Sequence, residues 1–205
     1  GDCMAARELL RFPSIEHIDL VEIDPVMIEI FNSTLFYKCR NRGSLESPKV
    51  QVHIKDALEF MHETPKCLYD IVILDFPSPN ALGKSANLFS GETYRLTATM
   101  LSPGGVLCAQ VSVRPSLFHA CGNALIAERL NVWSWESYYS EHGNHDVFLL
   151  ATGLNDNAIS DRLACAGILP DGLRFITPDV LLSIFTPTNE VTTESLNHLK
   201  LVGAF

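Results

Sequence analysis

Short apolar runs alternate along this chain with segments that begin like helices. The runs suited to buried strands are residues 18–23, 50–54, 69–74 and 106–111. Asp24 and Pro25 supply an N-cap and a first-turn proline for a helix whose apolar positions reach Leu35, and Asp56 opens a capping-box-like helix start. Strands that alternate with helices predict an α/β fold with a Rossmann-like, doubly wound, mostly parallel sheet.

The later part of the chain predicts further elements of the same sheet. They are helices over 90–100 and 116–129, a turn at 103–105, and strands near 132–136 and 147–151. The last two strands predict an antiparallel edge, which the alternating Trp133 and Trp135 suit. The apolar run 69–74, broken only by Asp70, predicts a strand covered on both faces.

The chain length and hydrophobic content suit one compact domain. Its 205 residues are 47% hydrophobic, and a chain of this size can bury a core large enough to fold without covalent cross-links. We expect a domain over residues 1–152 and a helical appendage, 153–205, packed on it. The helix-like start after Gly1 and Asp2 has no strand before it, so the first strand of a Rossmann-like unit is expected to be missing.

Charge and composition exclude several classes of protein. A net charge of −9 argues against sequence-independent binding of nucleic acid. Neither a long apolar run nor a signal peptide is visible, which predicts a cytoplasmic chain with no membrane span. Six scattered cysteines without a CxxC pair predict buried, reduced thiols. His142 and His145 lie in a turn-like segment, so no metal site is expected.

Polar side chains end several of the apolar runs, at the edge where open parallel sheets bind ligands. Glu22 either accepts hydrogen bonds from ribose hydroxyls or is a solvated strand-end acid. Asp56 either meets an adenine amino group or caps the next helix, and one carboxylate can do both. Asp75 begins a stiff, proline-rich loop and has no evident structural role. Gln110 lies at the end of a later strand.

A further candidate lies at the start of the chain. Asp2 stands beside Gly1 at a helix N-terminus, where free backbone N–H groups favour an anionic or polar part of a ligand. A simple N-cap is the alternative role for Asp2.

Several of these segments resemble, in order, the motifs of the spermidine synthase (aminopropyltransferase) family, which has a class I S-adenosylmethionine-methyltransferase-like fold. The similar segments are residues 1–10, 20–24, 55–57, 69–75, 88–94 and 102–110, within a region of resemblance that covers 1–152. Residues 175–182 are similar to the end of a bacterial branch in which this domain is joined to a membrane region.

The resemblance implies a role for each candidate residue. Gly1 and Asp2 would hold the aminopropyl end of decarboxylated S-adenosylmethionine, Glu22 its ribose, and Asp56 with the backbone of Ala57 its adenine. Asp75 would be the catalytic acidic residue. The residues implied to line the substrate pocket are Ser78, Gln110 and Tyr139.

The implied reaction is attack of a polyamine nitrogen, such as that of putrescine, on the aminopropyl carbon, with release of methylthioadenosine and no metal. Ser78 stands where the family usually has a second carboxylate, and Cys3 replaces a glycine of the cofactor loop. Two alternatives therefore stay open: a methyltransferase-like enzyme that uses intact S-adenosylmethionine, and a catalytically silent nucleoside-binding or regulatory domain. A homodimer is also compatible with the sequence.

Overall fold

The structure is a computed structural model that describes residues 2–77, 84–111, 115–138 and 145–154. The chain divides into two compact units, one within residues 1–63 and the other within residues 64–205, and each is described by itself. The expected appendage 153–205 lies almost wholly outside the described residues, and the division at residue 152 stays a prediction. In the described part of the chain, none of the helices is long and apolar enough to cross a membrane.

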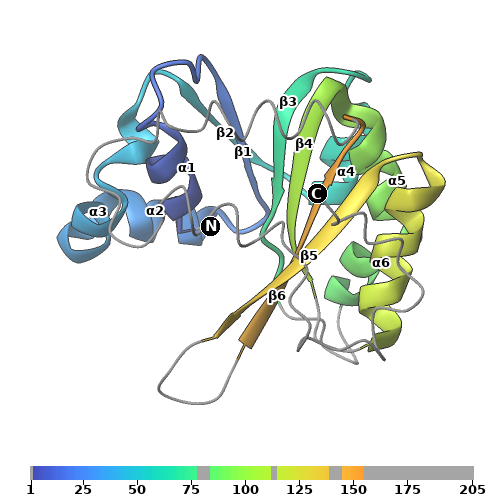
Figure 1. Ribbon diagram of the computed structural model, residues 1–205. Helices are drawn as coiled ribbons and strands as arrows, with labels where there is room; N and C mark the ends of the chain where they lie inside the picture. Colours follow the sequence, from blue (N-terminus) through green and yellow to red (C-terminus); the bar gives the residue numbers. More distant parts are fainter. Residues whose placement is uncertain (1, 78–83, 112–114, 139–144, 155–205) are drawn as a thin grey trace. The chain divides into compact units, whose positions relative to one another are not determined.

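The first unit is built on two parallel strands. Strand β1 (Ile18–Glu22) pairs with β2 (Val50–Ile54) (Figure 1), and their register places Glu22 opposite Ile54. The other elements of this unit are α1 (Met4–Leu9), α2 (Pro25–Ser33), α3 (Leu35–Asn41), the 3-10 turn η1 (Ser44–Glu46) and α4 (Ala57–Glu63). Both predicted strands are confirmed, and so is the start of α2, where the Val26 N–H donates to Asp24 Oδ1 over 2.9 Å.

The segment after Asp24 forms two helices instead of the single helix predicted to reach Leu35. Thr34 separates α2 from α3 because its backbone is extended, with ψ of 117°. Its N–H donates to the Ile30 carbonyl at the end of α2, and its own carbonyl accepts from the Lys38 N–H in the first turn of α3. A β-branched residue has low helix propensity, which fits this break.

The second unit is built on a four-stranded mixed sheet with the strand order β3-β4-β6-β5. Its strands are β3 (Tyr69–Leu74), β4 (Leu101–Val111), β5 (Asn131–Tyr138) and β6 (His145–Thr152). Its helical elements are η2 (Lys84–Phe89), α5 (Gly91–Met100) and α6 (Pro115–Ala127). The β3–β4 pair is parallel, while β6 runs antiparallel to both β4 and β5, which confirms the predicted antiparallel edge.

Residues 103–105 were predicted to form a turn before a strand. This prediction is wrong, because β4 already begins at Leu101 and includes these residues. Tyr69 pairs with Leu101 and Ile71 with Val106, so β4 carries three extra residues between these two pairs. Gly104 has φ of 80° at this bulge. The turn-forming residues therefore bend a strand locally instead of ending one.

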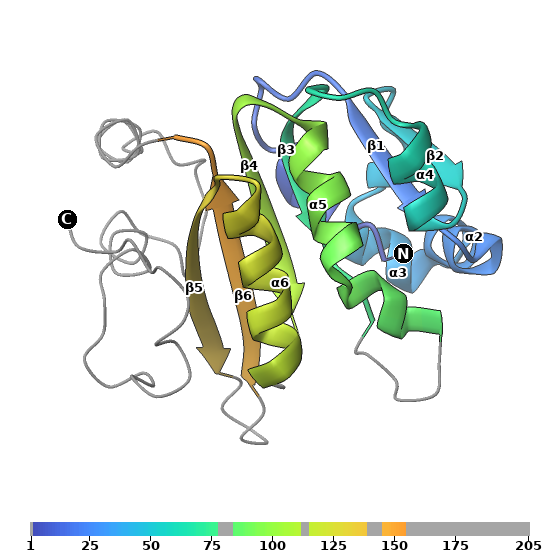
Figure 2. The ribbon, with the colours of Figure 1, turned by 90° about the vertical axis from the view of Figure 1, so that its right-hand side faces the viewer.

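The two faces of the second sheet are covered unequally. Helices α5 and α6 lie on the same face (Figure 2), and Leu107, Ala109 and Val111 of β4 are buried there. The strand at residues 69–74 was predicted to be covered on both faces. This is wrong for the face opposite α5 and α6, where Ile71 and Ile73 remain 45% and 40% exposed. The physical reason is that both described helices that pack on this sheet lie on one side of it.

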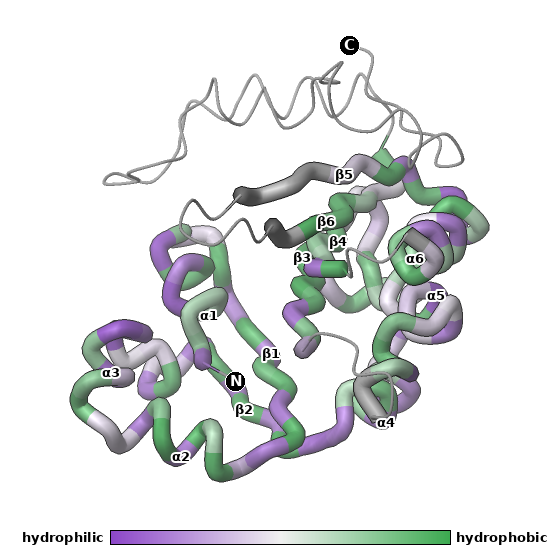
Figure 3. The backbone as a smooth tube through the Cα atoms, turned by 90° about the horizontal axis from the view of Figure 1, so that it is seen from below, coloured by the Kyte–Doolittle hydropathy of each residue, from purple (hydrophilic) through white to green (hydrophobic). Residues whose placement is uncertain are grey.

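The Rossmann-like α/β class is confirmed, with its strands divided between two sheets. Among the described residues, β1 has a paired strand on one edge only, β2, and β3 has one only, β4. Apolar residues predominate along both strands in the hydropathy view (Figure 3). The expected missing first strand stays a prediction.

Candidate functional site

The carboxyl ends of β1 and β2 bring two of the candidate acids to one edge of the first sheet. The Lys55 N–H donates to the Glu22 carbonyl oxygen over 3.0 Å, which extends the parallel ladder past Ile54. Asp56 is the next residue, so it lies at the same edge as Glu22. This is the edge at which ligands bind in open parallel sheets.

Glu22 is held as an ionised acceptor. Its Oε1 accepts from the Asp24 N–H over 2.9 Å, and its side chain is half-buried. Burial acts to raise the pKa of this carboxyl group, but hydrogen bonds, foremost that from the Asp24 N–H, and a nearby positive charge bring the net pKa below its usual 4.5. An ionised carboxylate in this position can accept hydrogen bonds from a diol.

Asp56 caps the next helix and keeps acceptor capacity. Its Oδ1 accepts from the N–H groups of Leu58 and Glu59, over 2.9 and 3.3 Å, at the first turn of α4. The capping role expected as one alternative is thus observed. The residue is exposed, and its Oδ2 has no hydrogen-bond partner among the described residues. Ala57 is the first residue of α4, where backbone N–H groups have no partner within the helix.

The start of α1 brings Asp2 and a thiol close to Glu22. Asp2 Oδ1 accepts from the Met4 N–H over 3.0 Å, which is the local capping role. Burial raises the pKa of the Cys3 thiol to about 11, and the carboxylates of Asp2 and Glu22 add to the rise. Two of the candidate carboxylates are therefore electrostatically coupled to Cys3 within the first unit.

Cys3 holds a backbone conformation that suits glycine. Its φ is 63° and its ψ 18°, and the Ser44 hydroxyl donates to its carbonyl over 3.0 Å. A left-handed conformation costs a side-chain-bearing residue roughly 1–2 kcal/mol. The glycine that the resembling family has here would adopt it without that cost.

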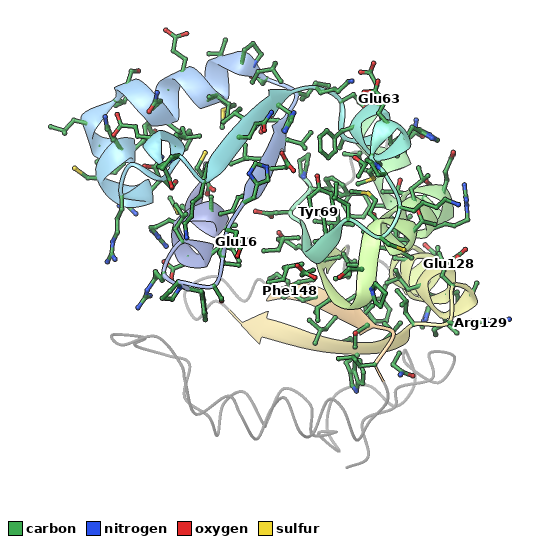
Figure 4. The ribbon with its side chains drawn as sticks, turned by 90° about the horizontal axis from the view of Figure 1, so that it is seen from above. Glu16, Glu63, Tyr69, Glu128, Arg129 and Phe148 are labelled. Carbon is green, nitrogen blue, oxygen red and sulfur yellow. The ribbon has the colours of Figure 1, made fainter. Side chains whose placement is uncertain are left out.

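Asp75 belongs to the second unit and comes directly after β3. Leu74 pairs with Ala109, so the next residues along the two parallel strands, Asp75 and Gln110, are neighbours. Because side chains alternate along a strand, both lie on the face opposite α5 and α6. Gln110 pairs in turn with Phe148 of β6, which Figure 4 labels.

Cys108 is a neighbour of Asp75 that the sequence prediction did not include. Burial raises the pKa of its thiol to about 11, and the negative charge of Asp75 adds to the rise. The signal was available, because Cys108 lies two residues before Gln110 on one strand and shares its face. A neutral thiol therefore lies close to the carboxylate of Asp75.

Several predictions stay untested. Four of the residues named in them lie outside the described part of the chain: Gly1, Ser78, Tyr139 and His142. The convergence of Asp75 with Asp2, Glu22 and Asp56 on a single ligand stays a prediction. Across the described ranges, no group of three or more acidic, histidine or cysteine side chains could hold a metal ion.

The prediction of uniformly buried thiols is wrong for two cysteines. The five described cysteines are all unbridged, which agrees with the reduced state, and Cys165 lies outside the described residues. Cys3 and Cys121 are buried, but Cys39 and Cys67 are exposed. The reason is local: Cys39 lies on the exposed side of α3, and Cys67, with φ of 57°, lies in the turn before β3.

Comparison with known proteins finds one matching family model, the spermine/spermidine synthase domain, which matches residues 1–121. A polyamine aminopropyltransferase 2 from Bacillus cereus is 29% identical over 204 residues, covering 98% of this chain and 53% of that protein. A polyamine aminopropyltransferase from Oceanobacillus iheyensis is 34% identical over 185 residues, covering 88% and 34%. The chain thus spans about half the length of the first of these relatives.

Solved structures give the same fold. A spermidine synthase from Thermotoga maritima superposes with a TM-score of 0.75 at 21% identity, covering 92% of this chain and 63% of that one. A spermidine synthase in complex with the transition-state analogue AdoDATO superposes with a TM-score of 0.77 at 21% identity, covering 92% and 64%. At this level of identity the likeness establishes the fold.

Proposed function

This chain belongs to the spermine/spermidine synthase family, and from that premise we propose that it is the cofactor-binding and catalytic part of a cytoplasmic polyamine aminopropyltransferase. The proposed reaction transfers an aminopropyl group from decarboxylated S-adenosylmethionine to a polyamine such as putrescine. The observation that carries the proposal is the shared strand edge at which Glu22 and Asp56 lie, joined by the bond from Lys55 to Glu22. The relatives named polyamine aminopropyltransferase support it.

The first unit has the groups that a nucleoside needs. The Glu22 carboxylate would accept from the two ribose hydroxyls, because its low pKa keeps it ionised at neutral pH. Asp56 Oδ2 would accept from the adenine amino group while Oδ1 keeps its capping bonds, and the Ala57 N–H would donate to a ring nitrogen. Asp2 would hold the ammonium end of the aminopropyl chain.

The second unit would hold the amine acceptor. An alkylammonium with a pKa near 10 must lose its proton before it attacks, which costs about 4 kcal/mol at neutral pH. Asp75 is too weak a base to remove that cost alone. Its proposed role is to orient the amine, take part in passing its proton to water, and stabilise the positive charge that develops on nitrogen. Gln110, with Ser78 and Tyr139, would line the acceptor pocket.

The proposed step is a single displacement. The amine nitrogen forms a bond to the aminopropyl carbon as the bond from that carbon to the sulfonium sulfur breaks. The sulfur leaves as the neutral thioether of methylthioadenosine, and the positive charge passes to the new secondary ammonium, which stays protonated at neutral pH. The thioether needs no protonation, so no general acid is required for the leaving group.

Calorimetric titration of the chain with decarboxylated S-adenosylmethionine, S-adenosylmethionine and methylthioadenosine tests the proposal. We expect tighter binding of the decarboxylated form than of the intact one, and formation of spermidine when putrescine is added. Preference for the intact form would instead favour a methyltransferase-like enzyme. Binding of none of the three would favour the catalytically silent domain, for which the strained, buried Cys3 is the specific observation.

A further inference from the structure

Phe76, the residue directly after Asp75, makes a ring contact that the proposed chemistry does not use. The centres of the Phe76 and Phe89 rings lie 6.1 Å apart, and the rings meet edge to face with an angle of 76° between their planes. Aromatic pairs prefer this arrangement at such a separation. The contact therefore joins the segment that follows β3 to the end of η2.

Phe89 is a firmly held partner for this contact. Its side chain is only 3% exposed, and its carbonyl oxygen accepts from the Cys121 thiol of α6 over 3.7 Å. The next residue, Ser90, begins α5. Its N–H donates to the Asn87 carbonyl over 3.1 Å, and its hydroxyl oxygen accepts from the Thr93 N–H over 3.3 Å. Phe89 is thus fixed by both helices that pack on the second sheet, and its ring offers Phe76 a rigid surface.

The residues on either side of Asp75 face these helices, while Asp75 faces away from them. Leu74 is buried on the face that α5 and α6 cover. Pro77 restricts Phe76 to an extended backbone, because the proline ring clashes with a helical conformation of the residue before it. Side chains alternate along extended backbone, which places Phe76 on the same face as Leu74. Asp75 therefore lies between two neighbours whose side chains are anchored on the helical side.

We infer that Phe76 is a positioning residue, whose contact with Phe89 fixes the direction of the Asp75 carboxylate. The inference rests on the proposed function, in which Asp75 orients the attacking amine. The anchored ring of Phe76 prevents rotation of the peptide between the two residues, and such a rotation would carry the carboxylate away from the strand edge. Misplacement of a reacting group by about 1 Å can cost roughly 100-fold in rate.

The thiol of Cys108 reports where that carboxylate lies. Ile73 pairs with Cys108, so Cys108 is on the adjacent strand and on the same face as Asp75. Burial raises the pKa of this thiol to about 11, and the negative charge of Asp75 adds to the rise. A displaced carboxylate would lower this pKa and leave more thiolate to react. Truncation of Phe76 would not itself uncover the thiol, because Phe76 lies on the other side of the sheet.

Steady-state kinetics with decarboxylated S-adenosylmethionine and putrescine measure the effect on turnover. Phe76→Ala should lower kcat about 10- to 100-fold with little change in the affinity for methylthioadenosine. Phe76→Leu should recover most of that loss, because it keeps an apolar side chain against Phe89. Val132→Ala is the matched control, since Val132 is buried in the same unit on the strand farthest from β3. Circular dichroism verifies that each variant is folded. An unchanged kcat in Phe76→Ala, or an equal loss in Val132→Ala, would overturn the inference.

Alkylation of Cys108 by iodoacetamide tests the same inference without activity. If the unaltered chain forms no spermidine, the proposed reaction fails, and this measurement still decides whether Phe76 positions Asp75. At about pH 9, Cys108 should react faster in Phe76→Ala than in the unaltered chain and should approach its rate in Asp75→Asn. A rate that only Asp75→Asn raises would overturn the inference. A rate that neither variant changes would also reject it, because the carboxylate would then not lie beside the thiol. Equal acceleration at Cys121 would show a loosened core instead, and would likewise overturn it.

Discussion

The backbone N–H of Lys55 donates to the carbonyl oxygen of Glu22 over 3.0 Å, one step beyond the last paired residues of β1 and β2. This bond keeps the two strands parallel up to the point where each is followed by a helix. The side chains of Glu22 and Asp56 are thereby held at one edge by backbone bonds and do not depend on flexible loops. A site built in this way is rigid before a ligand arrives.

We expect Glu22→Gln to weaken binding of methylthioadenosine by about 10- to 100-fold. The amide keeps one acceptor but loses the charge, and a hydrogen bond to a charged group contributes about 1.5–3 kcal/mol. Calorimetric titration measures the loss. Glu16→Gln is the matched control, since Glu16 is an exposed acid of the same unit. Unchanged affinity in Glu22→Gln would remove this carboxylate from the ribose site.

The pH dependence of nucleoside binding should follow the ionisation of Glu22. Its pKa lies below the usual 4.5 in the folded chain, so the carboxylate is fully present at neutral pH. A lowered pKa means that the acceptor is lost only as the pH falls through that lowered value. Affinity for methylthioadenosine should therefore be flat from pH 8 to about 5 and fall below that range, in titrations at constant ionic strength. A loss of affinity already between pH 7 and 6 would contradict this assignment.

Asp75→Asn should abolish aminopropyl transfer while leaving nucleoside binding nearly intact. The carboxylate is proposed to orient the amine and stabilise its developing charge, which is worth about 10²- to 10⁴-fold in rate. A product assay with putrescine, beside a binding assay, separates the two effects. Asp70→Asn on the same strand is the control, because the amide oxygen can still accept from the Ser102 hydroxyl. Equal turnover in Asp75→Asn and the unaltered chain would exclude Asp75 from the mechanism.

Strands and helix starts could be predicted closely, because their signals are local. The run 69–74 and the strand 50–54 have the predicted bounds, and Ser90 caps α5 through a bond from the Thr93 N–H. The break at Thr34 and the bulge at 103–105 could not be placed in this way. Both depend on how the neighbouring helix or strand packs and pairs, which residue type alone does not indicate.

Within the site, the sequence indicates which acids end the strands but not what else those acids bind. The capping bonds of Asp56 and Asp2 were foreseen as alternatives, and the structure shows that both are made. The left-handed backbone of Cys3 could not be foreseen from the substitution alone. The proximity of Cys108 to Asp75 depends on the β3–β4 pairing, which becomes known only when the strands are aligned.

Gly105→Ala should destabilise the second unit by about 1–3 kcal/mol. A Cβ at this position would lie 3.0 Å from the carbonyl oxygens of Ser102 and Tyr69, and these backbone atoms cannot rotate away. Urea unfolding followed by circular dichroism measures the change. Gly153→Ala is the matched control, because its Cβ would meet nothing closer than a Leu130 methyl group at 3.8 Å. Equal stability of the two variants would mean that the bulge at β4 is looser than described.

The described cysteines should react with iodoacetamide at two clearly different rates at pH 8. Cys39 and Cys67 are exposed and should be alkylated first. Cys3, Cys108 and Cys121 should lag by at least tenfold, because burial raises the pKa of each thiol to about 11 and leaves little thiolate to react. Mass spectrometry of proteolytic peptides over time resolves the order, and full unfolding in urea should make the rates equal. Early alkylation of Cys108 would contradict the raised pKa of its thiol.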